Sequence, residues 1–178
     1  ETSPESASTS IQTNVFTFEF NEYIKANKIN DLLIISPSQK INPTTKIKGK
    51  KLYITLNDTL LENTTYVFNF GEAIVDLNEG NPIQNYQYVF STGESLDSLS
   101  ISGRVVDAFS LKVEEKAIVM LYPKFQMDSI PAKQLPIYLA KSDAEGNFVS
   151  SNIKEGEYQL FSLLDANSNY LYDRPDEK

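Results

Sequence analysis

The C-terminal stretch of the chain, residues 165–177, carries oxygen-bearing side chains at the spacing of a calcium-binding loop. If Asp165 is taken as the first position, the oxygen ligands recur in the rhythm of an EF-hand-type loop, in which one residue contributes its backbone carbonyl. Calcium prefers such carboxylate, amide and carbonyl oxygens. The predicted metal ligands are Asp165, Asn167, Asn169, Leu171 (through its carbonyl), Asp173 and Asp176.

Two departures from that loop leave a second interpretation open. Tyr170 stands where an EF-hand loop has glycine for its sharp turn, and Asp176 is shorter than the usual bidentate glutamate, although Glu177 follows it. The flanking residues also have the pattern of strands rather than helices. The alternative is an Asn/Asp-rich loop whose side chains bind their own backbone. Calcium, if bound, would stiffen this loop and would not take part in a reaction.

Tyrosine side chains could form a surface for a glycan or a peptide, because they combine a flat apolar ring with a polar tip. We expect Tyr86 and Tyr88 to lie in or beside the core, since they alternate along a strand with Phe90. Tyr170 and Tyr172 fall in the loop and are predicted to be exposed. The candidates are Tyr53, Tyr86, Tyr88, Tyr122, Tyr138, Tyr170 and Tyr172.

The composition argues against catalysis. The chain has no histidine and no cysteine, which removes the main zinc ligands, a cysteine nucleophile and the base of a Ser–His–Asp triad. Adjacent carboxylates occur at Glu114-Glu115 and Asp176-Glu177, but a glycosidase needs two carboxyl groups that face each other across a cleft. Neighbours on a strand point to opposite faces. We therefore predict no catalytic residue and no cofactor apart from calcium.

Charge and hydrophobicity exclude further classes of function. The 178 residues carry a net charge of −8, whereas nucleic-acid binding and docking on an anionic membrane both need a basic surface. The sequence contains no apolar run long enough to span a bilayer. Hydrophobic residues make up 40% of the chain, which is enough to build a packed core.

The elements that must position these side chains are predicted to be strands. In residues 14–20, Phe16, Phe18 and Phe20 alternate with polar residues, as in a half-buried strand. The only candidate helix is residues 21–31, which could give one short turn. Further strands are expected at 31–36, 51–56, 64–70, 85–92, 100–108, 117–123, 135–143, 146–152 and 156–165, with a long loop at 124–136.

This pattern predicts an all-β chain of two antiparallel β-sandwich domains in tandem. Residues 1–10 are rich in Ser, Thr and Glu and are expected to form a flexible tether. The first domain is predicted over residues 11–93 and the second over residues 100–178, with a linker at 94–99. The basic run at 46–51 is explained as a hairpin turn whose lysines protect an edge strand.

The first half resembles the bacterial immunoglobulin-like domains of S-layer proteins and surface lipoproteins. The similarity rests on "FTFEFNEYI", "IISP", "LYITLNDTLLENTTYVFNF", "IVDLNEGNPI" and "YVFSTG", which occur in that order within residues 11–93. In this pattern Leu60 to Tyr66 form a corner, with Asn63 and Thr64 in the turning backbone and Tyr66 in the core. Gly80 is expected to adopt a positive φ.

The second half resembles the carboxypeptidase-regulatory-like, transthyretin-type sandwich. The residues that carry the likeness are "SGRVVDA", "IVMLY" and "SDAEGNFVSSNIKEGEYQLFSL", across residues 98–170. Such domains are non-catalytic appendages, and a complete one needs a further strand after this point. The order of the two domains is similar to that in lipoproteins of Gram-negative envelopes. This likeness implies export to the periplasm or the outer-membrane surface and a lipid anchor upstream.

Three functions are weighed on these grounds. The first is a non-catalytic structural or interaction module of a bacterial envelope protein, with an unknown protein or glycan as its partner. The second is a module that binds glycan or peptide through exposed tyrosine, with a calcium-stiffened loop. The third, an enzyme that uses carboxylates, has the least support.

Overall fold

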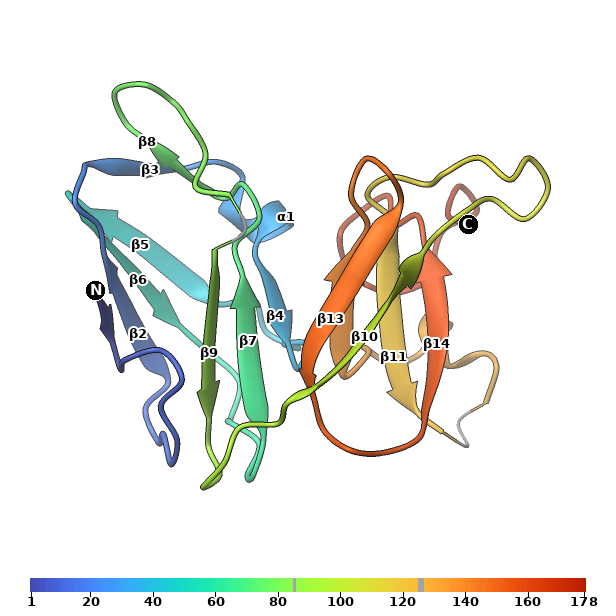
Figure 1. The fold of residues 1–178 in the computed structure, drawn as a ribbon, viewed down its shortest axis with the longest axis horizontal. Coiled ribbons are helices and arrows are strands. Elements are labelled where there is room, and N and C mark those ends of the chain that lie inside the picture. The colour runs from blue at the N-terminus through green and yellow to red at the C-terminus, as the bar shows by residue number, and fades with distance from the viewer. Residues whose placement is uncertain (85, 125–126) are drawn as a thin grey trace. The chain divides into compact units, whose positions relative to one another are not determined.

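The computed structural model describes residues 1–84, 86–124 and 127–178, and it confirms the prediction of an all-β chain (Figure 1). The chain divides into two compact units. The first contains Glu1–Ile35 and Gln39–Leu96, and the second contains Ser36–Ser38 and Asp97–Lys178.

The elements along residues 1–96 are short strands and one turn of helix. The expected strands at 14–20, 51–56, 64–70 and 85–92 are present, each slightly shorter than predicted. The segment 21–31 begins with an unpredicted strand, and its end forms the first part of the one-turn helix. The elements are β1 (Thr2–Ser3), β2 (Val15–Glu19), β3 (Ile24–Ala26), α1 (Ile29–Leu32), β4 (Ile34–Ser36), β5 (Thr44–Lys48), β6 (Lys51–Thr55), β7 (Thr65–Asn69), β8 (Ile74–Asp76) and β9 (Gln87–Ser91).

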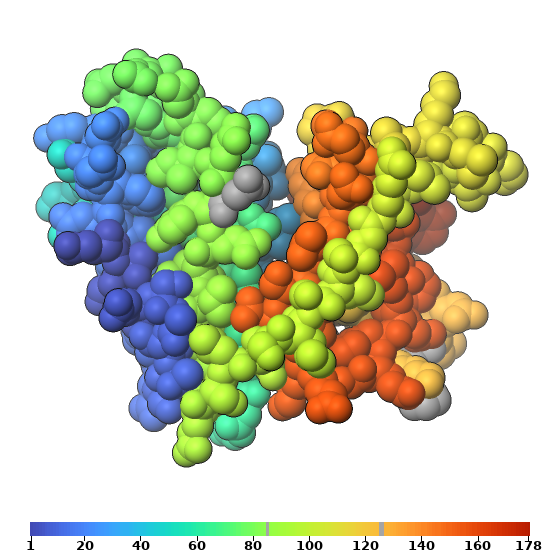
Figure 2. All heavy atoms as spheres, in the orientation of Figure 1, coloured from blue at the N-terminus to red at the C-terminus, as the bar shows by residue number. Residues whose placement is uncertain are grey.

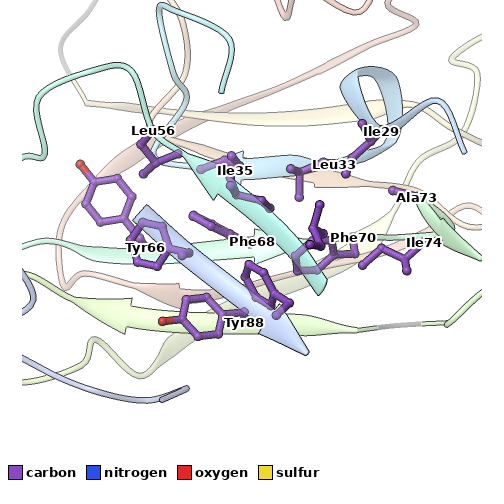
Figure 3. Close-up of a cluster of buried hydrophobic side chains, with 14 of the residues drawn as sticks. Ile29, Leu33, Ile35, Leu56, Tyr66, Phe68, Phe70, Ala73, Ile74 and Tyr88 are labelled. Atoms are coloured by element: carbon purple, nitrogen blue, oxygen red, sulfur yellow. The ribbon is translucent and has the colours of Figure 1, made fainter. Parts of the chain in front are cut away.

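Two sheets of the first unit enclose one aromatic core. One sheet has the strand order β1-β2-β6-β5 and the other β4-β7-β9, while β3 and β8 form a separate pair. Side chains alternate along β6, where Leu52 and Ile54 are fully buried and their neighbours are half-buried. Edge-to-face packing joins the sheets: the ring centroids of Phe16 and Phe68 are 5.2 Å apart, and those of Phe18 and Phe70 are 5.1 Å apart. Figure 3 shows the side chains of this cluster.

The predicted corner before β7 is confirmed. Tyr66 is buried, and its hydroxyl oxygen accepts a hydrogen bond of 2.8 Å from the backbone N–H of Leu61. Asn63 adopts a positive φ of 48° in the turning backbone. Gly80 has the expected positive φ, at 78°. These features are structural: they turn the chain and satisfy backbone groups that the sheets leave unpaired.

Residues 1–10 differ from the expected tether because they pair with both sheets. Strand β1 pairs with β2, and Glu1 exchanges backbone hydrogen bonds with Glu19. Further along, the N–H groups of Ala7 and Ile11 donate to carbonyl oxygens of β9. The composition of this segment suggested disorder, but the edges of β2 and β9 offer it backbone partners.

The second unit is built on two further antiparallel sheets. Strands β10 and β13 form one, and β12, β11 and β14 form the other in that order. Val119 and Leu121 of β11 pack in one core with Phe148 and Ile153 of β13. The elements are β10 (Leu99–Arg104), β11 (Ile118–Pro123), the 3₁₀ turn η1 (Ile130–Ala132), β12 (Tyr138–Lys141), β13 (Asn147–Ile153) and β14 (Tyr158–Leu163).

Strand β11 is buried along both of its faces, from Ile118 to Tyr122. Its outer face meets irregular chain: Pro131 of η1 and Tyr172 of the C-terminal loop line a small cavity together with Met120. The predicted long loop at 124–136 therefore contains a 3₁₀ turn that packs on the sheet, although Phe125 and Gln126 lie outside the described residues. In contrast, the segment between β10 and β11, yellow in Figure 2, protrudes from the surface and exposes 98% of Phe109.

Candidate functional site

The C-terminal loop that follows β14 places its first acidic residue at the start of a tight turn. Asp165 Oδ1 accepts hydrogen bonds from the backbone N–H groups of Asn167 (3.1 Å) and Ser168 (2.7 Å), and its Oδ2 accepts one of 2.8 Å from Tyr170. Each bond fixes a residue of the loop around this carboxylate. Asp165 therefore organises the backbone in the manner of an Asx turn.

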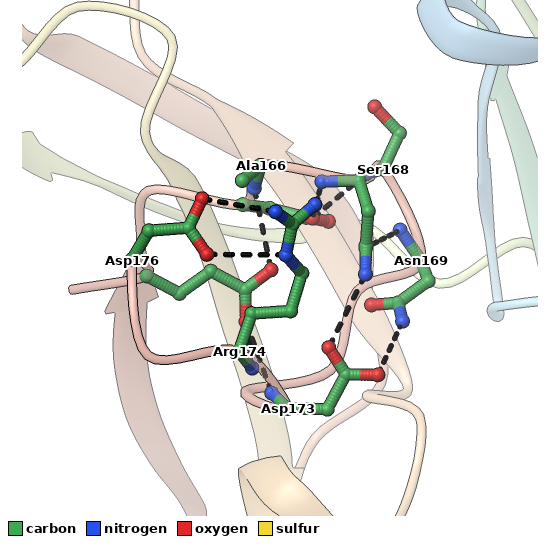
Figure 4. Close-up of polar contacts among 9 residues, drawn as sticks. Ala166, Ser168, Asn169, Asp173, Arg174 and Asp176 are labelled. Atoms are coloured by element: carbon green, nitrogen blue, oxygen red, sulfur yellow. Dashed lines mark hydrogen bonds and ion pairs between the residues drawn. The ribbon is translucent and has the colours of Figure 1, made fainter.

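Three other predicted ligands meet at one place in the loop, as Figure 4 shows. The side-chain NH₂ groups of Asn167 and Asn169 donate to the two carboxylate oxygens of Asp173, over 3.2 and 2.8 Å. The amide oxygens point to the backbone instead, and they accept from the N–H groups of Asn169 and Leu171. The two NH₂ groups thus lie where a cation bound to Asp173 would have to lie.

Asp176, another predicted ligand, is directed elsewhere. Asp176 forms an ion pair with Arg174, whose Nε lies 3.1 Å from Oδ1. Leu171 is half-buried. Glu177, considered in the sequence only as a neighbour of Asp176, is buried and anchors the loop. Its carboxylate accepts hydrogen bonds from the backbone N–H groups of Ala166, Asp173 and Arg174.

The residues described by the structure do not form an arrangement ready for a metal. Within residues 1–84, 86–124 and 127–178, no three His, Cys, Asp or Glu side chains are grouped so that they could hold an ion. A half-turn of the Asn167 and Asn169 amides would bring their oxygens toward Asp173, and only a cation would stabilise that arrangement. The calcium site stays a prediction.

Three other turns use the same chemistry as Asp165. Asp76 and Asp107 each accept backbone N–H groups two and three residues ahead, and Asp143 accepts from Glu145 and Asn147. Hydrogen bonds from the backbone, chiefly that of Ser110, lower the pKa of Asp107. Because turns of this kind recur in both units, the bonds of Asp165 do not by themselves indicate a ligand.

The tyrosine candidates do not gather into one surface. Tyr88, Tyr122 and Tyr138 are buried, and burial raises the pKa of Tyr122 to about 12. Tyr53 and Tyr86 are half-buried, and so is Tyr170, for which the prediction of exposure was wrong. Tyr172 exposes 49% of its surface, as expected for the loop. Tyr88 and Tyr138 belong to the two cores, as Tyr66 does, and Tyr86 packs against the first.

The adjacent carboxylates do not form a catalytic pair. Glu115 forms an ion pair with its neighbour Lys116, and Asp176 is occupied with Arg174. Glu177 points into the C-terminal loop. No two of these side chains face each other across a cleft in the described parts of the chain.

A groove that the sequence did not predict lies at one end of the first unit. It has a volume of about 640 Å³ and is lined by the segment before β2, the loop between β6 and β7, and Thr92. Polar groups of Gln12, Asn14 and Asn63 share this lining with two carboxylates, Asp58 and Glu62. The acidic residues of "NDTLLENTT" were the available signal, but only the fold brings residues 11–14 beside them.

The family of this protein follows from the sequence of its first unit. Residues 1–92 match the profile of the bacterial Ig-like domain. The chain belongs to the bacterial Ig-like domain family. No match was found among curated proteins.

Solved structures that resemble this bacterial Ig-like protein include an S-layer protein and two pilins. The N-terminal part of the S-layer protein SbsC is 15% identical, with a TM-score of 0.38; the alignment covers 87% of this chain and 38% of that one. The T6 backbone pilin of Streptococcus pyogenes is 11% identical, with a TM-score of 0.28, and covers 89% of this chain and 40% of the pilin. The major pilin subunit of Bacillus cereus is 14% identical, with a TM-score of 0.28, and covers 91% of this chain and 57% of the subunit. The chain thus spans less than two thirds of each, and we draw no argument from scores this low.

Proposed function

We propose that this bacterial Ig-like protein is a non-catalytic structural or interaction module of the bacterial cell envelope. The proposal rests on the contacts that the acidic side chains of this protein make. Asp76, Asp107, Asp143 and Asp165 each bind the backbone of their own turn. Groups that hold turns together in this way build a scaffold.

Composition supports the same conclusion. Histidine and cysteine, the commonest acid–base and nucleophilic groups, do not occur in the sequence. Among the residues that the structure describes, no helix is long and apolar enough to cross a membrane. We propose that the second unit is a carboxypeptidase-regulatory-like domain, and that a lipid anchor upstream of this chain holds it at the periplasmic or outer surface.

Cell fractionation tests the location. Antibodies against the purified chain should detect it in the envelope fraction of the bacterium that encodes it. Protease added to intact cells should degrade it if it lies on the outer surface, and only after the outer membrane is opened if it is periplasmic. Detection in the cytoplasm alone would contradict the proposal.

A ligand-binding role is a second candidate, and one observation favours it: Asn167, Asn169 and Asp173 converge on one point of the C-terminal loop. Calcium there would require both amides to turn their oxygens inward. Bound only by the folded state, it would raise the melting temperature of the protein. The expected result is a rise with calcium that Asp173→Asn removes.

A matched control separates this site from the ordinary turns. Asp143→Asn changes the same chemical group in the turn before β13 and should leave any calcium effect intact. If millimolar calcium does not shift melting of the unaltered protein, the metal prediction is wrong. A glycan array would then test whether the protein binds a glycan without calcium. If it binds no glycan on the array, the structural or interaction module stays as the proposed function.

A further inference from the structure

Two features of opposite charge lie at opposite ends of the same strands in the first unit. The hairpin between β5 and β6 carries four lysines within residues 46–51. The acidic groove begins just beyond the other end, because Asn14 immediately precedes β2 and Asp58 follows β6. Since β6 has five residues, the two features are separated by roughly 16 Å along the strand axis.

Two of the four lysines at the basic end have partners within the unit. Lys51 pairs with Glu19 over 2.9 Å, and Lys50 donates to the carbonyl of Asn21. Within the described parts of the chain no ion pair involves Lys46 or Lys48, and both are exposed. Lys48 also lies directly opposite Lys51 in the strand register, a like-charge pairing that costs stability.

The groove at the other end of the strands is acidic and partly apolar. Asp58 and Glu62 supply negative charge, and no lysine or arginine lines it. Ile11, Leu60 and Leu61 offer apolar wall, which suits the aliphatic stems of lysine side chains. Its volume of about 640 Å³ falls within the usual range of ligand-binding pockets, and a hairpin tip is small enough to enter it.

We propose that the lysine hairpin of one copy docks in the acidic groove of a second copy. The shared chemistry is charge complementarity: the chain is acidic as a whole, so its own basic hairpin is the segment suited to its own groove. Each contact uses the hairpin of one copy and the groove of the next copy, so the interface is heterologous. Repetition produces a head-to-tail row of copies, which is open unless the rotation between copies closes it into a ring.

The proposal names a partner for the interaction module proposed above, and it rests on that function. Lysines on an edge strand discourage backbone pairing with the edge strand of another copy. The proposed contact is therefore made through side chains. Such an interface is small and belongs to the weak, transient class. It is also sensitive to salt, because the Debye length shrinks as ionic strength rises.

Sedimentation velocity of the full chain tests the proposal. At about 20 mM salt the sedimentation coefficient should increase with protein concentration, and at roughly 0.5 M salt the increase should disappear. Lys46→Glu/Lys48→Glu should weaken self-association by about tenfold or more. Gln12→Lys/Glu62→Lys reverses the sign of the groove and should do the same. It leaves Asp58 in place, whose carboxylate accepts hydrogen bonds from the backbone N–H groups of Lys40 and Ile41.

Mixing the two variants gives a positive result that misfolding cannot imitate. The groove variant keeps the lysine hairpin and the hairpin variant keeps the acidic groove, so an equimolar mixture should associate through this intact pair although neither variant does so alone. Lys112→Glu/Lys154→Glu, with the same change of net charge in the second unit, should associate like the unaltered chain. A chain that stays monomeric at low salt, or a mixture that stays monomeric, overturns the proposal. Neither result bears on location in the envelope.

Discussion

The two units bury their strands in different ways. In the first, β6 alternates between buried and half-buried side chains, and its inner face packs on aromatic rings that join two sheets. In the second, β11 is buried on both faces, and irregular chain around η1 and Tyr172 lies beside its outer face. The hydroxyl of Tyr122 on that strand donates to the carbonyl of Gln134.

This difference shows that loops play unequal parts in the two units. The first unit can rely on sheet-to-sheet packing, while the second needs its loops to complete the burial of a central strand. Turns at Asp107, Asp143 and Asp165 and the buried Glu177 hold that loop structure together. The C-terminal loop, which has the spacing of a metal loop in the sequence, therefore also contributes to the packing of this unit.

The largest effect is expected in the aromatic core. Phe68 is fully buried, and its ring lies 5.2 Å from that of Phe16 and 5.7 Å from that of Tyr88. Phe68→Ala should lower the free energy of unfolding of the first unit by about 3–5 kcal/mol, because it leaves a cavity between the sheets. Denaturant unfolding, monitored by hydrogen exchange in each unit, would measure this loss of free energy. Equal loss of protection in both units would contradict the expectation that the substitution acts on the first unit alone.

Alkaline pH should weaken the second unit through Tyr122. Burial raises its pKa to about 12, above the value near 10 of an unfolded tyrosine. The stabilisation is therefore complete below pH 10 and is lost as the pH rises to about 12, by roughly 2–3 kcal/mol. Unfolding free energies measured across this range should show a steeper fall than those of Tyr122→Phe. Identical slopes would count against the burial of this hydroxyl.

Glu177 tests whether the C-terminal loop is structural. Glu177→Gln replaces one acceptor oxygen by a donor that faces backbone N–H groups, and it should cost about 1–3 kcal/mol. Hydrogen exchange at Ala166, Asp173 and Arg174 should accelerate, with little change in the first unit. Asp176→Asn at the exposed neighbouring position is the control and should have almost no effect. Unchanged exchange in Glu177→Gln would argue that the loop depends on another contact.

The smallest effect compares two matched hydroxyl groups. The hydroxyl oxygens of Tyr66 and Tyr138 each accept a backbone N–H, from Leu61 over 2.8 Å and from Lys154 over 3.0 Å. Each Tyr→Phe change should cost about 1 kcal/mol in its own unit. Thermal melting with probes in both units would detect the two changes. A much larger cost for Tyr138→Phe would show that the second unit depends more strongly on its loop contacts.

Period-two patterns predicted most strands because one face of each meets a core. Phe16 and Phe18 in β2, and Tyr66, Phe68 and Phe70 in and after β7, are examples. Strands β1, β3, β5 and β8 were missed because β1 and β5 have no buried side chain, β3 and β8 are only three residues long, and backbone pairing defines all four. Backbone pairing depends on which edge is free in the fold, and composition cannot show this. Residues 1–10 illustrate the same limit.

The candidate sites were predicted less well for a related reason. The spacing of Asp165, Asn167 and Asn169 fits a metal loop and an Asx turn equally, because both need side-chain oxygens close to the backbone. Only the structure shows that Glu177 anchors this loop. The groove was invisible in the sequence, because it joins Gln12 to Glu62 across fifty residues.

The N-terminal segment has a mechanical consequence. Glu1 is bonded to Glu19 in one sheet, while Ala7, Ser8 and Ile11 are bonded along β9 in the other, and Ser8 runs parallel to Phe90. Tension between Glu1 and the chain that leaves β9 would load this parallel contact in shear, so that its bonds must break together. A pulling force would therefore meet a clamp at the first unit before it reached the aromatic rings inside.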